Sequence, residues 1–81
     1  MTETFVSFTF ASREETRENM RTLWRRDINA RARGKELLIP VPEHGLGFSM
    51  NELKGWLTPP LKTGMFDSER LPTGRCVRYW Y

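Results

Sequence analysis

The sequence predicts a small α+β fold in which strands and helices alternate, giving a three-stranded mixed sheet with one long amphipathic helix on one face. Apolar residues alternate in extended fashion near both ends of the chain, and they recur at helical spacing in between. The length of 81 residues allows one modest core, because a chain of this size buries only about 60% of its unfolded surface. We therefore expect a single domain over residues 1–81.

The first strand and the long helix follow from short local patterns. Residues 4–10 are expected to be extended, because a valine and two phenylalanines occupy every second position. Ser12 and Glu15 have the spacing of a capping box, which satisfies the first backbone N–H groups of a helix. That helix is predicted to continue to about residue 33, where Gly34 would supply a left-handed stop.

The middle of the chain predicts a second strand and a short helix. Residues 35–41 are apolar and β-prone, and two nearby prolines limit hydrogen bonding, so this strand is expected at a sheet edge. Ser49 and Glu52 form a second capping-box pattern. A short helix is therefore predicted over residues 50–57, ended by the Pro-Pro pair that follows.

The last third of the chain is predicted to be a loop followed by a strand. Residues 61–74 mix glycine and proline with scattered apolar residues, which is typical of a long surface loop. Residues 75–81 combine high β-propensity with alternating basic and apolar side chains. They are expected to form the third strand, which would complete the sheet.

The charge pattern favours binding over metal or cofactor chemistry. The formal net charge is +3, and ten of the thirteen basic residues are arginine, whose planar group suits contact with carboxylate and phosphate. One histidine and one cysteine cannot form a zinc site, and no glycine-rich phosphate loop is present. We expect no metal ion and no cofactor.

The compartment is predicted from cysteine usage and hydropathy. The lone Cys76 cannot form an intramolecular disulfide, which favours a reducing, cytoplasmic location. The longest apolar runs fall far short of the ~20 residues that a membrane-spanning helix needs. The first residues lack the basic flank and apolar run of a signal peptide. Membrane binding and secretion are therefore not expected.

Arginine and aromatic residues gather in two places. Four arginines spaced by four run along one edge of the apolar sector of the long helix. They suit phosphate or an acidic protein face, or else their stems cover the core and their heads pair with nearby glutamates. In the last strand, cations beside flat rings suit stacking or an interface, or else the rings are core. The candidate binding residues are Arg13, Arg17, Arg21, Arg25, Arg75, Arg78, Tyr79, Trp80 and Tyr81.

Two classes of binding function fit this surface. The first is a non-enzymatic protein that engages an acidic partner, either nucleic acid or a nucleoprotein complex. The alternative is a stand-alone inhibitor or adaptor whose target is a protein, as small phage or mobile-element anti-defence and host-takeover proteins often are, because tryptophan, tyrosine and arginine dominate protein interfaces. An aromatic terminal strand at a sheet edge could also pair with its own copy, giving a homodimer.

A third interpretation makes the chain an enzyme. His44 is the only side chain that titrates near neutrality, so it would serve as general acid or base in metal-free RNA cleavage. Arg75, Arg78 and Tyr81 would then support the phosphate. The Arg- and Tyr-bearing terminal segment and the chain length resemble small basic toxins of the RelE/YoeB type. The resemblance implies ribonuclease activity, and it covers fewer than ten residues.

Overall fold

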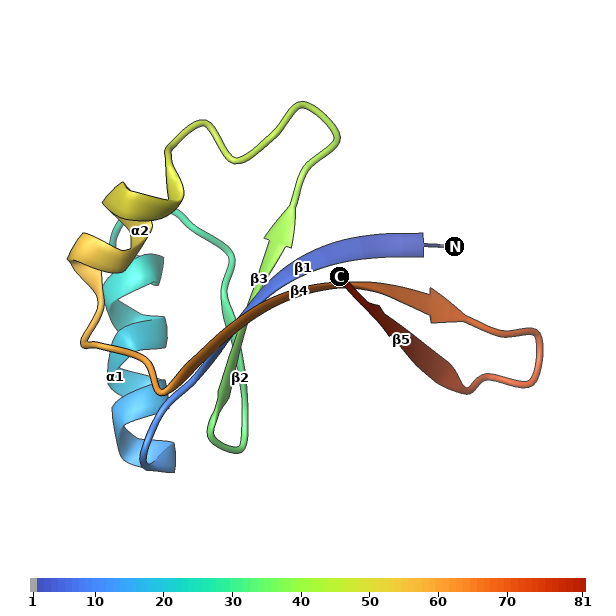
Figure 1. The fold of residues 1–81 in the computed structure, drawn as a ribbon, viewed down its shortest axis with the longest axis horizontal. Coiled ribbons are helices and arrows are strands. Elements are labelled where there is room, and N and C mark those ends of the chain that lie inside the picture. The colour runs from blue at the N-terminus through green and yellow to red at the C-terminus, as the bar shows by residue number, and fades with distance from the viewer. Residues whose placement is uncertain (1) are drawn as a thin grey trace.

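A computed structural model describes residues 2–81, in which two helices cover one face of a five-stranded antiparallel sheet (Figure 1). The spatial order of the strands is β2-β3-β1-β4-β5. Within residues 2–81 neither helix is long and apolar enough to cross a bilayer. The elements are, in chain order, β1 (Thr2–Thr9), α1 (Arg13–Trp24), β2 (Arg31–Arg33), β3 (Glu36–Val41), α2 (Met50–Trp56), β4 (Lys62–Arg70) and β5 (Cys76–Trp80).

The structure confirms the α+β class and corrects the sheet. The expected three-stranded mixed sheet is wrong, since five strands are present and every neighbouring pair is antiparallel. The single long helix is also wrong, because α1 has 12 residues and the segment expected to continue it forms β2. The expected loop over residues 61–74 mostly forms β4, the longest strand.

The helix α1 ends early because of a local hydrogen-bond motif that contains no glycine. The N–H of Ile28 donates to the carbonyl of Leu23 at 3.0 Å, and the N–H of Asp27 donates to that of Trp24 at 3.0 Å. Asp27 has a φ of 60°, in the left-handed region. This is the Schellman arrangement, in which one left-handed residue reverses the chain and satisfies the last carbonyls. Gly34, the expected stop, instead forms the turn between β2 and β3 with a φ of 63°.

β4 forms although its sequence contains glycine, because it is paired along nearly its whole length. Its residues lie opposite β1 from Thr9↔Lys62 to Thr2↔Glu69. The turn that follows is closed by Gly74, whose φ is 86°, so the irregular part of the segment is only the connection to β5. β3 was expected at an edge, but β2 covers its first half, as far as Leu38.

The main core lies between the sheet and the two helices. Strands β1 and β3 supply Val6, Phe8, Leu37 and Ile39, all fully buried. Each such side chain contributes about 1.5–3 kcal/mol relative to leaving it exposed. The rest of the buried cluster comes from the helices and their flanking loops: Phe10, Leu23, Ala30, Leu53 and Leu57.

Polar contacts secure both helix starts. Ser12 accepts a hydrogen bond from the N–H of Glu15 at 3.1 Å, but the Glu15 carboxylate accepts from Thr58 rather than closing the box. Ser49 and Glu52 form the complete capping box that the sequence predicts. These contacts fix where α1 and α2 begin. Both helices lie on the same side of the sheet, so its opposite face has no helix over it (Figure 1).

Candidate functional site

The open face of the sheet carries a row of aromatic rings across three strands. Phe5 on β1 lies opposite Phe66 on β4, which lies opposite Trp80 on β5. The first two rings stack with centroids 5.4 Å apart, and the second and third are 4.7 Å apart. Phe66 is only 1% exposed, whereas Trp80 is 52% exposed. The row is thus a small second core whose outer ring still meets solvent.

A glycine makes room for this arrangement. The indole of Trp80 lies over Gly64 on β4, and a Cβ at that position would be 2.9 Å from Cζ3 of the ring. Real Cβ atoms do not approach carbon so closely, so any side chain there would push the indole away. Gly64 therefore lets Trp80 cover Phe66 closely.

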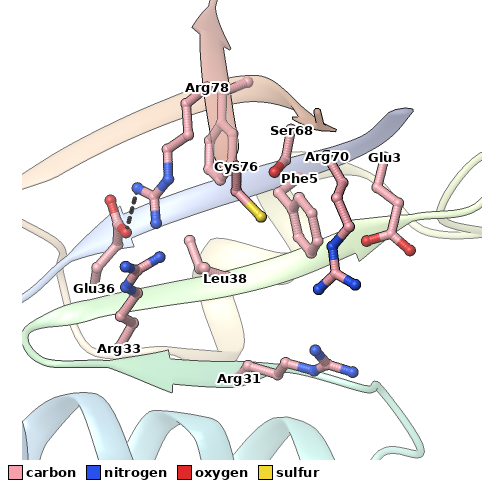
Figure 2. Close-up of a pocket in the computed structure, with 11 residues that line it drawn as sticks. Glu3, Phe5, Arg31, Arg33, Glu36, Leu38, Ser68, Arg70, Cys76 and Arg78 are labelled. Atoms are coloured by element: carbon pink, nitrogen blue, oxygen red, sulfur yellow. Dashed lines mark hydrogen bonds and ion pairs between the residues drawn. The ribbon is translucent and has the colours of Figure 1, made fainter. Parts of the chain in front are cut away.

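A groove of about 940 Å³ opens on this face, between β2 on one side and the β4–β5 hairpin on the other (Figure 2). Its floor includes Phe5, Leu38 and Ser68 from three different strands. Four arginines line it, two from β2 and two from the hairpin: Arg31, Arg33, Arg70 and Arg78. The remaining lining residues are Glu3, Glu36, Phe66 and Cys76.

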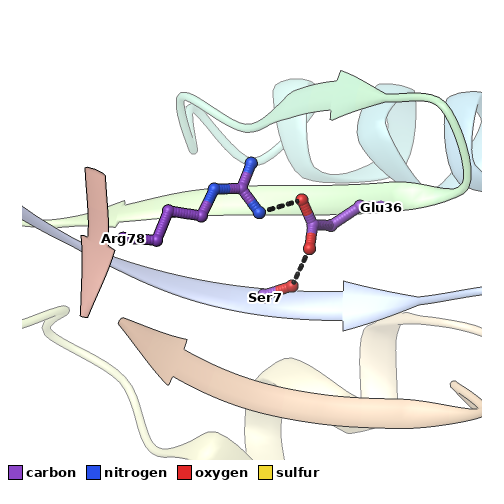
Figure 3. A network of polar contacts seen from close by, with 3 residues as sticks. All are labelled: Ser7, Glu36 and Arg78. Atoms are coloured by element: carbon purple, nitrogen blue, oxygen red, sulfur yellow. Dashed lines mark hydrogen bonds and ion pairs between the residues drawn. The ribbon is translucent and has the colours of Figure 1, made fainter. Parts of the chain in front are cut away.

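One arginine of the groove is held by a carboxylate. Nη1 of Arg78 lies 2.7 Å from Oε1 of Glu36, and the hydroxyl of the buried Ser7 donates to Oε2 of the same glutamate at 3.0 Å (Figure 3). The guanidinium also lies 4.6 Å from the centroid of Phe66. Arg78 is therefore fixed across the sheet, and its charge is compensated within the fold.

The other three arginines of the groove have no such partner. Arg78–Glu36 is the one ion pair in the part of the chain that the structure describes, residues 2–81. Arg31, Arg33 and Arg70 are all exposed. The carboxylate of Glu3 lines the groove next to Arg70 and offsets part of this charge (Figure 2). The groove thus presents an excess of positive charge over an apolar floor.

The structure separates the residues predicted from the sequence into several surfaces. The four arginines of the predicted helix row are exposed on the helix-covered side of the sheet, at positions 13, 17 and 21 on α1 and at position 25 directly after it. Two of them, Arg13 and Arg17, line a shallow hollow of about 210 Å³ beside β2, together with Ala32 and Gly34. No ion pair joins this row to a glutamate within the described residues. The row therefore lies apart from the groove.

The terminal segment is divided by strand alternation. Arg78 and Trp80 point to the open face, whereas Tyr79 and Tyr81 point to the opposite face of the hairpin. Arg75 is exposed in the turn that precedes β5. Of the nine predicted residues, Arg78 lines the groove and Trp80 lies next to it.

The two tyrosines face carboxylates of β4. The Tyr81 hydroxyl donates to Asp67, which also accepts from the Thr4 hydroxyl at 2.6 Å. The hydrogen bond to Asp67 raises the pKa of Tyr81. The pKa of Tyr79 is raised mainly by a hydrogen bond to Glu69 and secondly by the negative charge of that glutamate. Both phenols are therefore expected to stay protonated, as hydrogen-bond donors, above the ordinary range of tyrosine.

Sequence reasoning missed most of the groove. The sequence predicts Arg31 and Arg33 at the end of a helix and Phe66 and Arg70 in a loop, whereas all four lie on strands. The alternation Arg31-Ala32-Arg33 before a Gly-Lys turn was the available signal for a short strand with both arginines on one face. This strand signal was missed because residues 31–33 were included in the predicted helix.

The chemistry available in the groove is ionic and aromatic. Among residues 2–81, no three metal-ligating side chains come together. His44 lies in the connection between β3 and α2 and does not line the groove. No protein-family model, no curated protein and no solved structure matches this chain.

Proposed function

We propose that the chain is a non-enzymatic binding protein that takes a single strand of nucleic acid into the groove on the open face of the sheet. The observation that carries the proposal is the combination of Arg31, Arg33 and Arg70, which have no ion-pair partner within the described residues, with accessible aromatic surface on the same face. A ligand that fits must supply several negative charges and flat apolar groups.

The arrangement favours a single strand over a duplex. Single-strand binding combines a cationic groove that follows the backbone with rings on which bases stack. Here the arginines come from both sides of the groove, while Phe5 lies on its floor and Trp80 beside it. In a duplex the base faces are stacked inside, so they could not stack on Phe5 or Trp80.

Fluorescence anisotropy with labelled single-stranded and duplex oligonucleotides over a salt series tests the proposal. The variant Arg31→Gln/Arg33→Gln removes two charges from the groove, and Arg21→Gln/Arg25→Gln removes two from the exposed helix row as a matched control. The groove variant is expected to lose affinity and to reduce the magnitude of the log K against log[salt] slope by about 1.4, at about 0.7 per phosphate contact. Equal losses of affinity in both variants would show that the groove is not the binding site. No binding of either oligonucleotide at low salt would overturn the proposed function.

A protein target is the second candidate, favoured by a different surface. On the far side of the hairpin, Met65, Tyr79 and Tyr81 are 37%, 51% and 77% exposed. Tyrosine anchors of this kind dominate protein interfaces. If a stoichiometric protein partner is retained on affinity purification, Tyr79→Ala should weaken its capture while Arg31→Gln/Arg33→Gln leaves it unchanged.

A further inference from the structure

The two edges of the sheet are protected to different degrees. The edge strand β2 has three residues, two of them arginines, and short charged strands resist pairing with other chains. The edge strand β5 has five residues and one charged side chain, Arg78. That side chain is drawn back over the sheet by Glu36, away from the edge (Figure 3). In the described chain, β5 is thus the sheet edge that no outward charged side chain protects from pairing with another strand.

The outward hydrogen-bonding groups of β5 follow from its register. The N–H of Tyr81 donates to the carbonyl of Met65 at 3.0 Å, and the N–H of Leu71 donates to that of Arg75 at 2.8 Å. Because bonded and non-bonded pairs alternate along an antiparallel ladder, Val77 and Tyr79 also bond inward to β4. The backbone groups of Cys76, Arg78 and Trp80 therefore point outward, where no strand lies within residues 2–81.

We propose that this edge pairs with β5 of a second copy of the chain, antiparallel and with Arg78 at the two-fold axis. The three outward residues are spaced evenly about Arg78, so the pattern is complementary to itself. Cys76 then lies opposite the partner's Trp80 in a hydrogen-bonded pair. Val77 lies opposite the partner's Tyr79 on the other face, a β-branched and aromatic pair of the kind that stabilises sheets.

Charge does not oppose this pairing, since each Arg78 is compensated by its own Glu36. Pairing would also cover part of Tyr79 and Trp80, which are 51% and 52% exposed. The two-fold axis would run perpendicular to a continuous ten-stranded sheet. At the seam, the face of β5 that carries Arg78 would therefore point to the same side in both copies.

A designed disulfide tests the register. In this pairing Cys76 and the partner's residue 80 have Cα atoms about 5.5 Å apart, within the range of a disulfide. The two Cys76 residues are offset by about 13 Å along the strands, too far to be joined. The variant Trp80→Cys should therefore form a covalent dimer on mild oxidation, whereas Cys76→Ser/Trp80→Cys and the unaltered protein should not.

Sedimentation of the unaltered protein tests the pairing independently of any substitution. Its mass should rise with concentration from 9.6 kDa towards twice that value. A protein that stays monomeric at its highest attainable concentration overturns the proposal even if Trp80→Cys fails to fold. Cross-linking of the Cys76→Ser/Trp80→Cys control as efficient as that of Trp80→Cys would overturn the register. Neither measurement uses nucleic acid, so the result is separate from that of the proposed binding function.

Discussion

Arg78 on β5 reaches Glu36 on β3, although β1 and β4 lie between these strands in the sheet. The contact distance is 2.7 Å, and both side chains are about three-quarters buried, being 25% and 21% exposed. Such a contact requires the hairpin to curl over the open face, where it forms one side of the groove. The guanidinium covers Phe66 on its way, so the ion pair and the aromatic row support each other.

Removing the Glu36 carboxylate should change the stability of the fold and its affinity for nucleic acid in opposite directions. Glu36→Gln keeps a hydrogen-bond acceptor but loses the charge that holds Arg78, so the free energy of unfolding is expected to fall by about 1–2 kcal/mol. Under the proposed function, nucleic-acid affinity should rise, because Arg78 becomes available to phosphate. Urea unfolding and anisotropy measure the two effects, with Glu18→Gln on the exposed face of α1 as the control. A loss of both stability and affinity would mean that the pair builds the groove rather than competing with its ligand.

Two glycine-to-alanine substitutions should change the free energy of unfolding in opposite directions. Gly64→Ala forces the Trp80 indole off Phe66, and overpacking of this kind costs about 1–3 kcal/mol. Gly55→Ala on α2 meets no atom within 4 Å and should stabilise the fold by about 0.5–1 kcal/mol through helix propensity. Thermal unfolding measures both, and tryptophan emission should shift in Gly64→Ala only. An unchanged melting temperature for Gly64→Ala would show that Trp80 moves without cost.

The end of α1 offers a stabilising substitution. Asp27 is the non-glycine residue with positive φ in the described chain, and glycine adopts that conformation without steric penalty. Asp27→Gly is expected to raise the free energy of unfolding by about 0.5–1 kcal/mol. Asn29→Gly, nearby and without positive φ, should lower it, because there glycine only adds freedom to the unfolded chain. Chemical denaturation of the pair tests the Schellman ending directly.

Acid stability should depend on Asp67. The hydroxyl of Thr4, and then that of Tyr81, donates to its carboxylate and lowers the pKa of Asp67 in the folded protein. A lowered folded pKa contributes stability above the unfolded pKa, and this contribution is lost as pH falls through the folded value. Asp67→Asn should therefore be less stable than the unaltered protein at neutral pH, with the difference shrinking in acid. Unfolding curves at several pH values would show a constant difference if the carboxylate charge played no part.

Tyr79 and Tyr81 should lose their phenolic protons at a higher pH than ordinary tyrosines do. Their pKa values are raised by Glu69 and Asp67, so phenolate absorbance should appear above the ordinary tyrosine value of about 10. A raised folded pKa gives stability that is present below the unfolded pKa and is lost as pH rises through the folded one. Tyr81→Phe leaves a single phenol and allows Tyr79 to be assigned. Titration of both at the ordinary value would contradict the contacts with β4.

Local patterns predicted the start of α1 better than its end. Ser12 and Ser49 mark helix starts through contacts within four residues, and both are confirmed. The end of α1 depends on Asp27 adopting a left-handed conformation, which is more typical of glycine. The strand β4 depends on pairing with β1, a partner more than fifty residues away in sequence. Propensity alone favours a loop there, and the ladder overrides it.

The sequence by itself determined the α+β class, the strands at both ends, the helix starts and the unusual supply of arginine beside aromatic rings. Only the tertiary structure decided which arginines act together. Arg31, Arg33 and Arg70 line one groove with Phe5 because strand register and sheet curl set their positions, whereas the helix row at positions 13–25 lies outside that groove. Register and curl arise from long-range packing, such as Arg78 on Glu36 and Trp80 on Gly64, and no local spacing encodes them.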